Sequence, residues 1–194
     1  MKLRFLLAAA VFVVTGCAAQ AQVGIYLNPI ATRVSNSTLD TSTYSFLGPT
    51  STARTFWGID YGIYYDFAHS NSIRLGVDLR GSDLHANNGA LKDLLVGLRV
   101  SGQPFASKVR PYAQLSIGAG YTKAPASAIS IGKVQFRAFG GLDYPIGKHV
   151  DFRAVEVGYG TLQTISSSTV GNGGNIAIPA STMLSVSSGL VFRF

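Results

Sequence analysis

The chain has 194 residues, which suits one domain built around a single core or barrel. Its formal net charge is +7, but the basic residues form no stripe with interleaved aromatics, so the composition speaks against a nucleic-acid-binding protein. Beyond the N-terminal segment no run of about 18 apolar residues occurs, which excludes a transmembrane helix there.

The N-terminal 21 residues have the composition of a signal peptide. Lys2 and Arg4 form a basic start, residues 5–14 form a short apolar segment, and Ala19-Gln20-Ala21 matches an A-x-A cleavage site. We therefore expect residues 1–21 to be removed on export, which leaves residues 22–194 as the mature domain outside the cytoplasm.

Cys17 is the only cysteine of the chain and leaves a second interpretation open. Val14-Thr15-Gly16-Cys17 is similar to a bacterial lipoprotein cleavage box, which would keep Cys17 as a lipidated N-terminus. Cleavage after Ala21 would instead give a mature chain without a disulfide. A mass spectrum of the mature N-terminus distinguishes the two, because a peptide that begins at Gln22 rules out lipidation.

The first predicted strand is 23–34. It is the weakest, because Pro29 has no N–H to give to a ladder, and we expect the poorest strand pairing there. A long segment rich in Ser, Thr and Asn follows at 35–54 and is predicted to be a loop.

The next predicted strand, 56–68, has the clearest pattern. Its odd-numbered residues from Trp57 to Phe67 are apolar or aromatic, and its even-numbered residues from Gly58 to Ala68 are small, acidic or hydroxylated. This period of two predicts a strand with one apolar and one polar face. Six further segments alternate in a similar way: 72–80, 91–101, 108–121, 132–144, 149–160 and 181–194.

The eight segments together predict a fold class. A slip in the alternation at Ala154-Val155 predicts a β-bulge. The connections alternate between long or polar loops and short turns, with loops at 35–54, 81–90, 122–131 and 161–180 and turns at 69–71, 102–107 and 145–148. This organisation predicts an all-β protein, an eight-stranded antiparallel up-and-down transmembrane β-barrel.

A soluble barrel of the lipocalin type would show the same alternation with its apolar face inside. Three features favour the inverted arrangement. The polar face is rich in glycine, the chain ends on an aromatic residue, and aromatics gather at both ends of the apolar face, as two membrane interfaces select. The predicted aromatic belts consist of Trp57, Tyr65, Phe67, Tyr121, Tyr144, Tyr159, Phe192 and Phe194.

The polar face carries charges of both signs, which predicts ion pairs inside the barrel. The expected network consists of Asp60, Asp66, Arg74, Asp78, Arg80, Arg99, Arg137, Asp143, Arg153 and Glu156. The expected partners are Asp60 and Asp66 with Arg74 and Arg80, and Arg137 with Glu156 or Arg153. Such a network would fill the lumen and leave no continuous pore.

Three segments carry a family resemblance: RPYAQLSIGAGY at 110–121, GGLDYP at 140–145 and GLVFRF at 189–194. They resemble the small eight-stranded outer-membrane barrels of Gram-negative bacteria, the OmpA-like and OmpX-like class. The resemblance implies a bacterial outer-membrane location, outer-membrane lipids and lipopolysaccharide as partners, and Phe194 as the signal read by the barrel-assembly machinery. We expect a monomer without the peptidoglycan-binding domain of the longer members.

The first functional hypothesis is a structural or surface-interaction barrel that acts through the polar loops 35–54 and 161–180. Arg33, Arg54 and Lys123 are expected at the outer rim, where they could contact lipopolysaccharide phosphates or simply be solvated.

Two alternatives are a lipid A-modifying enzyme and a narrow solute channel. An enzyme could use only His69, His85 or His149, and 67–71 (FAHSN) lacks the spacer residue of the deacylase HxSN motif. Eight strands argue against a channel. We therefore expect no enzyme, and the chain offers no Cys/His spacing or phosphate loop that would predict a metal or another cofactor.

Overall fold

The structure is a computed structural model that describes residues 22–39, 45–48, 50–70, 72–102, 108–125, 130–164 and 180–194. The predicted leader with Cys17, and most of the predicted loop 161–180, lie outside the described residues. The described residues form eight strands: β1 (Gln22–Asn36), β2 (Ala53–His69), β3 (Ile73–Ala86), β4 (Gly89–Gly102), β5 (Arg110–Lys123), β6 (Ser130–Pro145), β7 (Val150–Thr164) and β8 (Ser181–Arg193).

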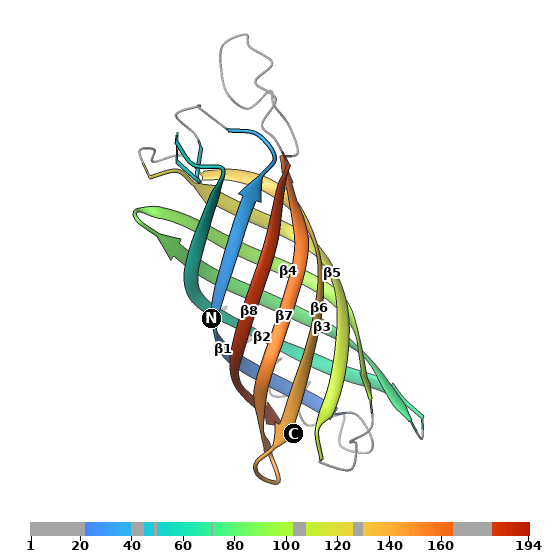
Figure 1. The fold of residues 1–194 in the computed structure, drawn as a ribbon. Coiled ribbons are helices and arrows are strands. Elements are labelled where there is room, and N and C mark those ends of the chain that lie inside the picture. The colour runs from blue at the N-terminus through green and yellow to red at the C-terminus, as the bar shows by residue number, and fades with distance from the viewer. Residues whose placement is uncertain are drawn as a thin grey trace, which may run out of the picture.

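The strands pair in chain order, each antiparallel to the next, and β8 pairs with β1 to close the barrel. The predicted eight-stranded up-and-down barrel is therefore confirmed. Figure 1 shows a tall cylinder of strongly tilted strands, with β1 and β8 side by side. We call the end that carries Gln22 and Phe194 the turn end, and the opposite end, which carries Asn36 and Ser181, the loop end.

The prediction of a loop at 81–90 is wrong. β3 continues to Ala86 and β4 begins at Gly89, so only Asn87 and Asn88 connect the two strands. Both asparagines have positive φ, 41° and 67°, which suits a two-residue hairpin turn and which asparagine tolerates better than most residues. Because this hairpin is rich in polar residues, the alternation of apolar and polar side chains does not reveal its strands.

A substitution at this turn tests its backbone conformation. We expect Asn88→Val to lower the free energy of unfolding by about 1 kcal/mol, because a β-branched residue is strained at positive φ. Asn88→Gly should not destabilise the barrel, since glycine adopts this conformation without strain. Urea unfolding in detergent micelles measures both variants, and equal stability of the two would contradict the assigned turn.

The predicted bulge in β7 is confirmed. The register between β7 and β8 shifts between Arg153 and Glu156, so Ala154 and Val155 both lie opposite Ser188. One extra residue on β7 therefore bends this strand locally.

The ladder between β1 and β8 is interrupted near the same place. Asn28 and Pro29 pair with no residue of β8, whereas the register between β1 and β2 runs unbroken from Gln22 to Ser35. Proline has no N–H to donate, so the predicted weakness of the first strand is confined to its β8 side. We call this region of interrupted pairing the seam gap; it is bounded by Pro29, Ala154, Val155 and Ser188.

Candidate functional site

The outward face of the barrel wall is apolar. Leu115 is 70% exposed and Leu98 is 60% exposed, and all eight strands contribute large apolar side chains to this surface. Monomeric soluble proteins rarely expose a contiguous apolar surface larger than a few hundred Å². The soluble lipocalin alternative is therefore excluded, because the apolar face lies outside and suits contact with hydrocarbon.

Aromatic residues stand at both ends of this wall. Trp57, Tyr121 and Tyr159 are exposed toward the loop end, and Tyr65 lies half-buried on the outward face toward the turn end. The remaining predicted belt residues are also exposed toward the turn end: Phe67, Tyr144, Phe192 and Phe194. Among the residues that the structure describes, no helix is long and apolar enough to cross a membrane.

The inward face holds buried ion pairs, and Arg80 and Glu156 lie at their centre. Arg80 is 1% exposed, and its two terminal nitrogens each donate to one carboxylate oxygen of Glu156 at 2.7 Å. Arg80 Nη1 also lies 3.1 Å from Asp60 Oδ2. Glu156 accepts further hydrogen bonds from the hydroxyls of Tyr112 and Ser187. These donors offset much of the cost of removing the Glu156 carboxylate from water.

A second cluster surrounds Asp143. Arg153 Nε lies 2.9 Å from Asp143 Oδ1, and Arg99 Nη2 lies 3.1 Å from Asp143 Oδ2. Arg153 Nη1 reaches Glu156 Oε2 at 3.3 Å, which joins the two clusters into one network.

Two expected pairings differ from the structure. Arg137 lies 3.4 Å from Asp93 and forms no ion pair with Glu156 among the described residues. Arg74 donates to the side-chain oxygen of Gln22 rather than to a carboxylate. Asp93 is not in the expected network, but it pairs with Arg137 and accepts a hydrogen bond from the Ser82 hydroxyl at 2.8 Å.

Aromatic rings alternate with the buried guanidinium groups. The guanidinium of Arg99 lies between the rings of Tyr64 and Tyr112, with Cζ 4.1 and 4.0 Å from the two ring centres. The guanidinium of Arg153 lies between the rings of Tyr112 and Tyr26, at 4.6 and 4.7 Å. Each such contact is worth about 2 kcal/mol when it is desolvated.

The alternation continues beyond Tyr26. Arg80 Cζ lies 5.1 Å from the Tyr26 ring centre and 3.9 Å from that of Phe139, and Arg137 contacts the same Phe139 ring at 4.7 Å. We call these eight residues the guanidinium–ring column: Tyr64, Arg99, Tyr112, Arg153, Tyr26, Arg80, Phe139 and Arg137. Tyr64, Tyr112 and Phe139 alternate in step with the inward charged residues of their own strands, which is the signal that could have predicted their position. Tyr26 alternates in step with Asn28 and Thr32, the buried polar residues of β1.

The interior becomes apolar toward the loop end. Phe46 and Leu47, from the connection between β1 and β2, pack there against inward-facing strand residues. We call this cluster the apolar plug; it consists of Ile30, Val34, Phe46, Leu47, Phe56, Leu84, Leu91, Leu162 and Met183.

Arg54 lies at the loop end, as expected, but its side chain contacts the apolar plug. Its Nη1 donates to the carbonyl oxygen of Phe46 at 3.3 Å, so the side chain holds the plug segment over the barrel mouth. Lys133 Nζ lies 4.6 Å from the Phe46 ring centre and supports the same segment.

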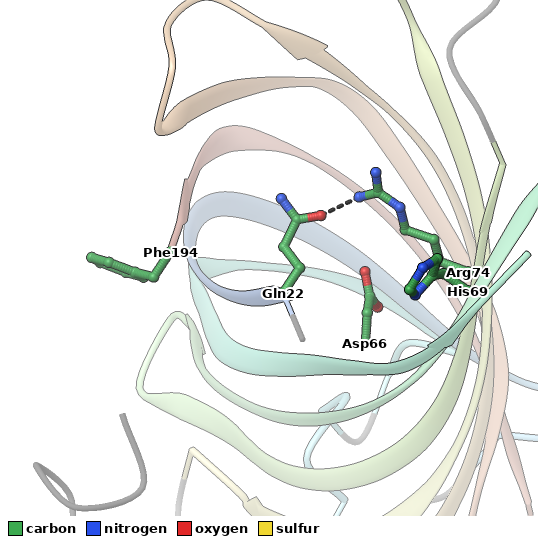
Figure 2. A pocket seen from close by; sticks show the side chains of 5 residues that line it. All are labelled: Gln22, Asp66, His69, Arg74 and Phe194. Carbon is green, nitrogen blue, oxygen red and sulfur yellow. Dashed lines mark hydrogen bonds between the residues drawn. The ribbon is translucent and has the colours of Figure 1, made fainter. Parts of the chain in front are cut away.

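A cavity of about 410 Å³ opens at the turn end, lined by five residues: Gln22, Asp66, His69, Arg74 and Phe194. Figure 2 shows the Arg74 guanidinium meeting Gln22 across this cavity, while the Phe194 ring points away from the other four side chains. Asp66 is 7% exposed and has no basic group within 4 Å among the described residues. The cavity is the opening of the barrel interior at the turn end.

The three histidines do not assemble a catalytic pair. His69 and His149 lie at the turn end, and His85 stands on the outward face of β3, 3.6 Å from Asp83. His149 Nδ1 lies 3.1 Å from the carbonyl oxygen of Arg193. Within the described ranges no serine hydroxyl bonds a histidine ring, and no group of three His, Cys, Asp or Glu side chains could hold a metal ion.

Comparisons with known proteins match the fold. No protein-family model matches the chain, and no curated protein sequence matches it either. The crystal structure of Neisserial surface protein A (NspA) matches with a TM-score of 0.57 and 16% identity, over 90% of this chain and 99% of that one. The attachment invasion locus protein Ail of Yersinia pestis matches with a TM-score of 0.54 and 11% identity, over the same shares.

The chain has the fold of a small eight-stranded outer-membrane β-barrel. A second structure of Ail, solved in complex with the heparin analogue sucrose octasulfate, matches equally well in fold. In outer-membrane β-barrels the short turns face the periplasm and the longer loops face outward. The turn end of this barrel corresponds to the periplasmic end of that class, and the loop end corresponds to the extracellular end.

Proposed function

We propose that the protein is an integral barrel of the bacterial outer membrane with a non-enzymatic structural or surface-interaction role. The observation that carries this proposal is the inverted barrel: an apolar wall outside, with the guanidinium–ring column and the apolar plug inside. A filled lumen leaves the wall and the loop end as the surfaces through which the protein meets other molecules.

Lipopolysaccharide and the barrel-assembly machinery are the proposed partners, and the proposed state is a monomer. Arg33 and Lys123 are exposed on the outward face near the loop end, where lipid phosphates lie. Lys92 is also exposed there, but it lies 2.9 Å from Asp83. Phe194 is exposed beyond the end of β8, which supports its proposed role as the assembly signal.

Membrane flotation tests the proposal. The full chain, expressed in a Gram-negative host, is expected to float with the outer-membrane fraction and to migrate differently on gels before and after heating. Recovery of folded protein in the detergent-free soluble fraction would overturn the proposal.

A conductance measurement tests the channel alternative. We expect the purified protein to give no stable conductance steps in planar bilayers, because buried side chains occupy the lumen. Arg33→Gln, which alters only the outer wall, serves as the matched control and should be equally silent. Regular ion-selective steps from the wild-type protein would favour a channel instead.

A further inference from the structure

A hollow lies on the outer wall at the seam gap. Its volume is about 510 Å³, and we call it the seam groove; its lining includes Pro29, Ala31, Trp57, Ala154, Val155, Val186 and Ser188. The groove opens outward, on the face where the rest of the wall carries large apolar side chains.

The groove follows from two local features of the sequence. The ladders on both sides of β8 are interrupted at this height, and small side chains at Ala31, Ala154 and Ser188 leave the wall thin. Ser188 donates its hydroxyl to the carbonyl oxygen of Arg153 at 2.9 Å, so its donor is already used. The groove therefore suits an apolar occupant.

Arg33 lies on β1 beyond the lining of this groove, toward the loop end. It lies on the same face of β1 as Ala31 and Pro29, two and four residues farther toward the loop end. At the rise of a β-strand, the step from Pro29 to Arg33 is about 13 Å along the tilted strand, close to half of the roughly 25 Å apolar band of such barrels. In the part of the chain that the structure describes, no carboxylate lies within 4 Å of Arg33.

We propose that the seam groove holds one acyl chain of lipid A from the extracellular leaflet, with a phosphate of the same molecule on Arg33. The groove supplies the apolar cradle, and Arg33 supplies an unpaired cation nearer the loop end, at the level expected for phosphates. This inference rests on the proposed outer-membrane function, because that membrane places lipid A in the leaflet at the loop end.

Trp57 makes the groove observable, because it is the only tryptophan of the chain and lines the groove. The wild-type protein is reconstituted in vesicles of phosphatidylcholine with brominated acyl chains, which quench tryptophan fluorescence on contact. Diphosphoryl lipid A is then added at a small mole fraction. We expect quenching to fall by about twofold, far more than dilution explains, because lipid A displaces the brominated chain from the groove.

Two variants and their controls decide the assignment. Arg33→Gln and Ala31→Phe should each abolish the lipid A effect, the first by removing the cation and the second by filling the groove. Lys92→Gln on β4 and Ala119→Phe on β5 make the same kinds of change elsewhere on the outer wall and should behave like the wild type. Heat-modifiable gel mobility checks that each variant is folded.

Three results would overturn the inference: a fall in quenching no larger than dilution, a full effect in folded Arg33→Gln, or an equal effect of phosphatidylglycerol in place of lipid A. None of them alters flotation of the wild-type protein, which tests the proposed function separately.

Discussion

Arg80→Met is expected to destabilise the barrel by about 3–5 kcal/mol, because it leaves buried carboxylates without their cation. Arg80 is the bidentate partner of Glu156 and the ion-pair partner of Asp60, and all three side chains are about 1% exposed. Methionine keeps an unbranched apolar side chain in place of the aliphatic part of arginine and removes the charge. Equilibrium urea unfolding in detergent micelles, followed by Trp57 fluorescence, measures the loss.

A double mutant separates an unpaired charge from lost packing. Arg80→Met combined with Glu156→Gln should be more stable than the sum of the two single losses, since the amide needs no cation. Arg110→Met is the control at the turn end and should cost less than about 1 kcal/mol, because Arg110 is partly exposed and Arg193 still pairs with Asp151. Simple additivity in the double mutant would contradict the network.

Leu115→Arg is expected to destabilise the membrane-inserted protein by about 2–4 kcal/mol, because it places a charge against hydrocarbon near mid-membrane. Leu115 lies near the middle of β5, paired with Leu98 and Ala138, and it is among the most exposed side chains of the wall. On a soluble protein the same exposed substitution would change stability by no more than about 0.5 kcal/mol. Urea unfolding in lipid vesicles measures the difference.

Thr182→Arg is the matched control for depth. Thr182 is an outward residue near the start of β8 at the loop end, where an arginine should cost about 0–1 kcal/mol. If Leu115→Arg and Thr182→Arg were equally mild, the wall would not face a membrane and the inverted barrel would be wrong.

Alternation in the sequence predicts the strands well wherever apolar and polar residues keep a strict period of two. The same signal located the bulge at Ala154-Val155, because a bulge is a change of phase. It failed at 81–90, where the outward residues Asp83 and His85 are polar although they lie on a strand. Outside the apolar band an outward residue need not be apolar, so the signal weakens at the ends of the strands.

The sequence predicts that ion pairs fill the interior, but it does not predict which residues pair with each other. The alternation along each strand places Arg80 and Glu156 on the inward face of the wall. They belong to β3 and β7, however, which are not neighbouring strands, and their side chains meet across the lumen. Partners across the lumen depend on the tilt and stagger of the whole barrel, which no single segment encodes. The apolar plug was missed for a related reason, since Phe46 and Leu47 come from a connection predicted to be polar and outside.

The closing contact between the first and last strands consists of two separate blocks of paired residues. One block joins Gly24–Leu27 to Leu190–Arg193, and the other joins Ile30–Asn36 to Ser181–Ser187. Because Asn28 and Pro29 interrupt the ladder between the two blocks, we expect each block to open locally without the other. A barrel that is closed by two separate blocks of strand pairing should stay closed when one block frays. During membrane insertion, the pairing of β1 with β8 can therefore begin at either end of the barrel.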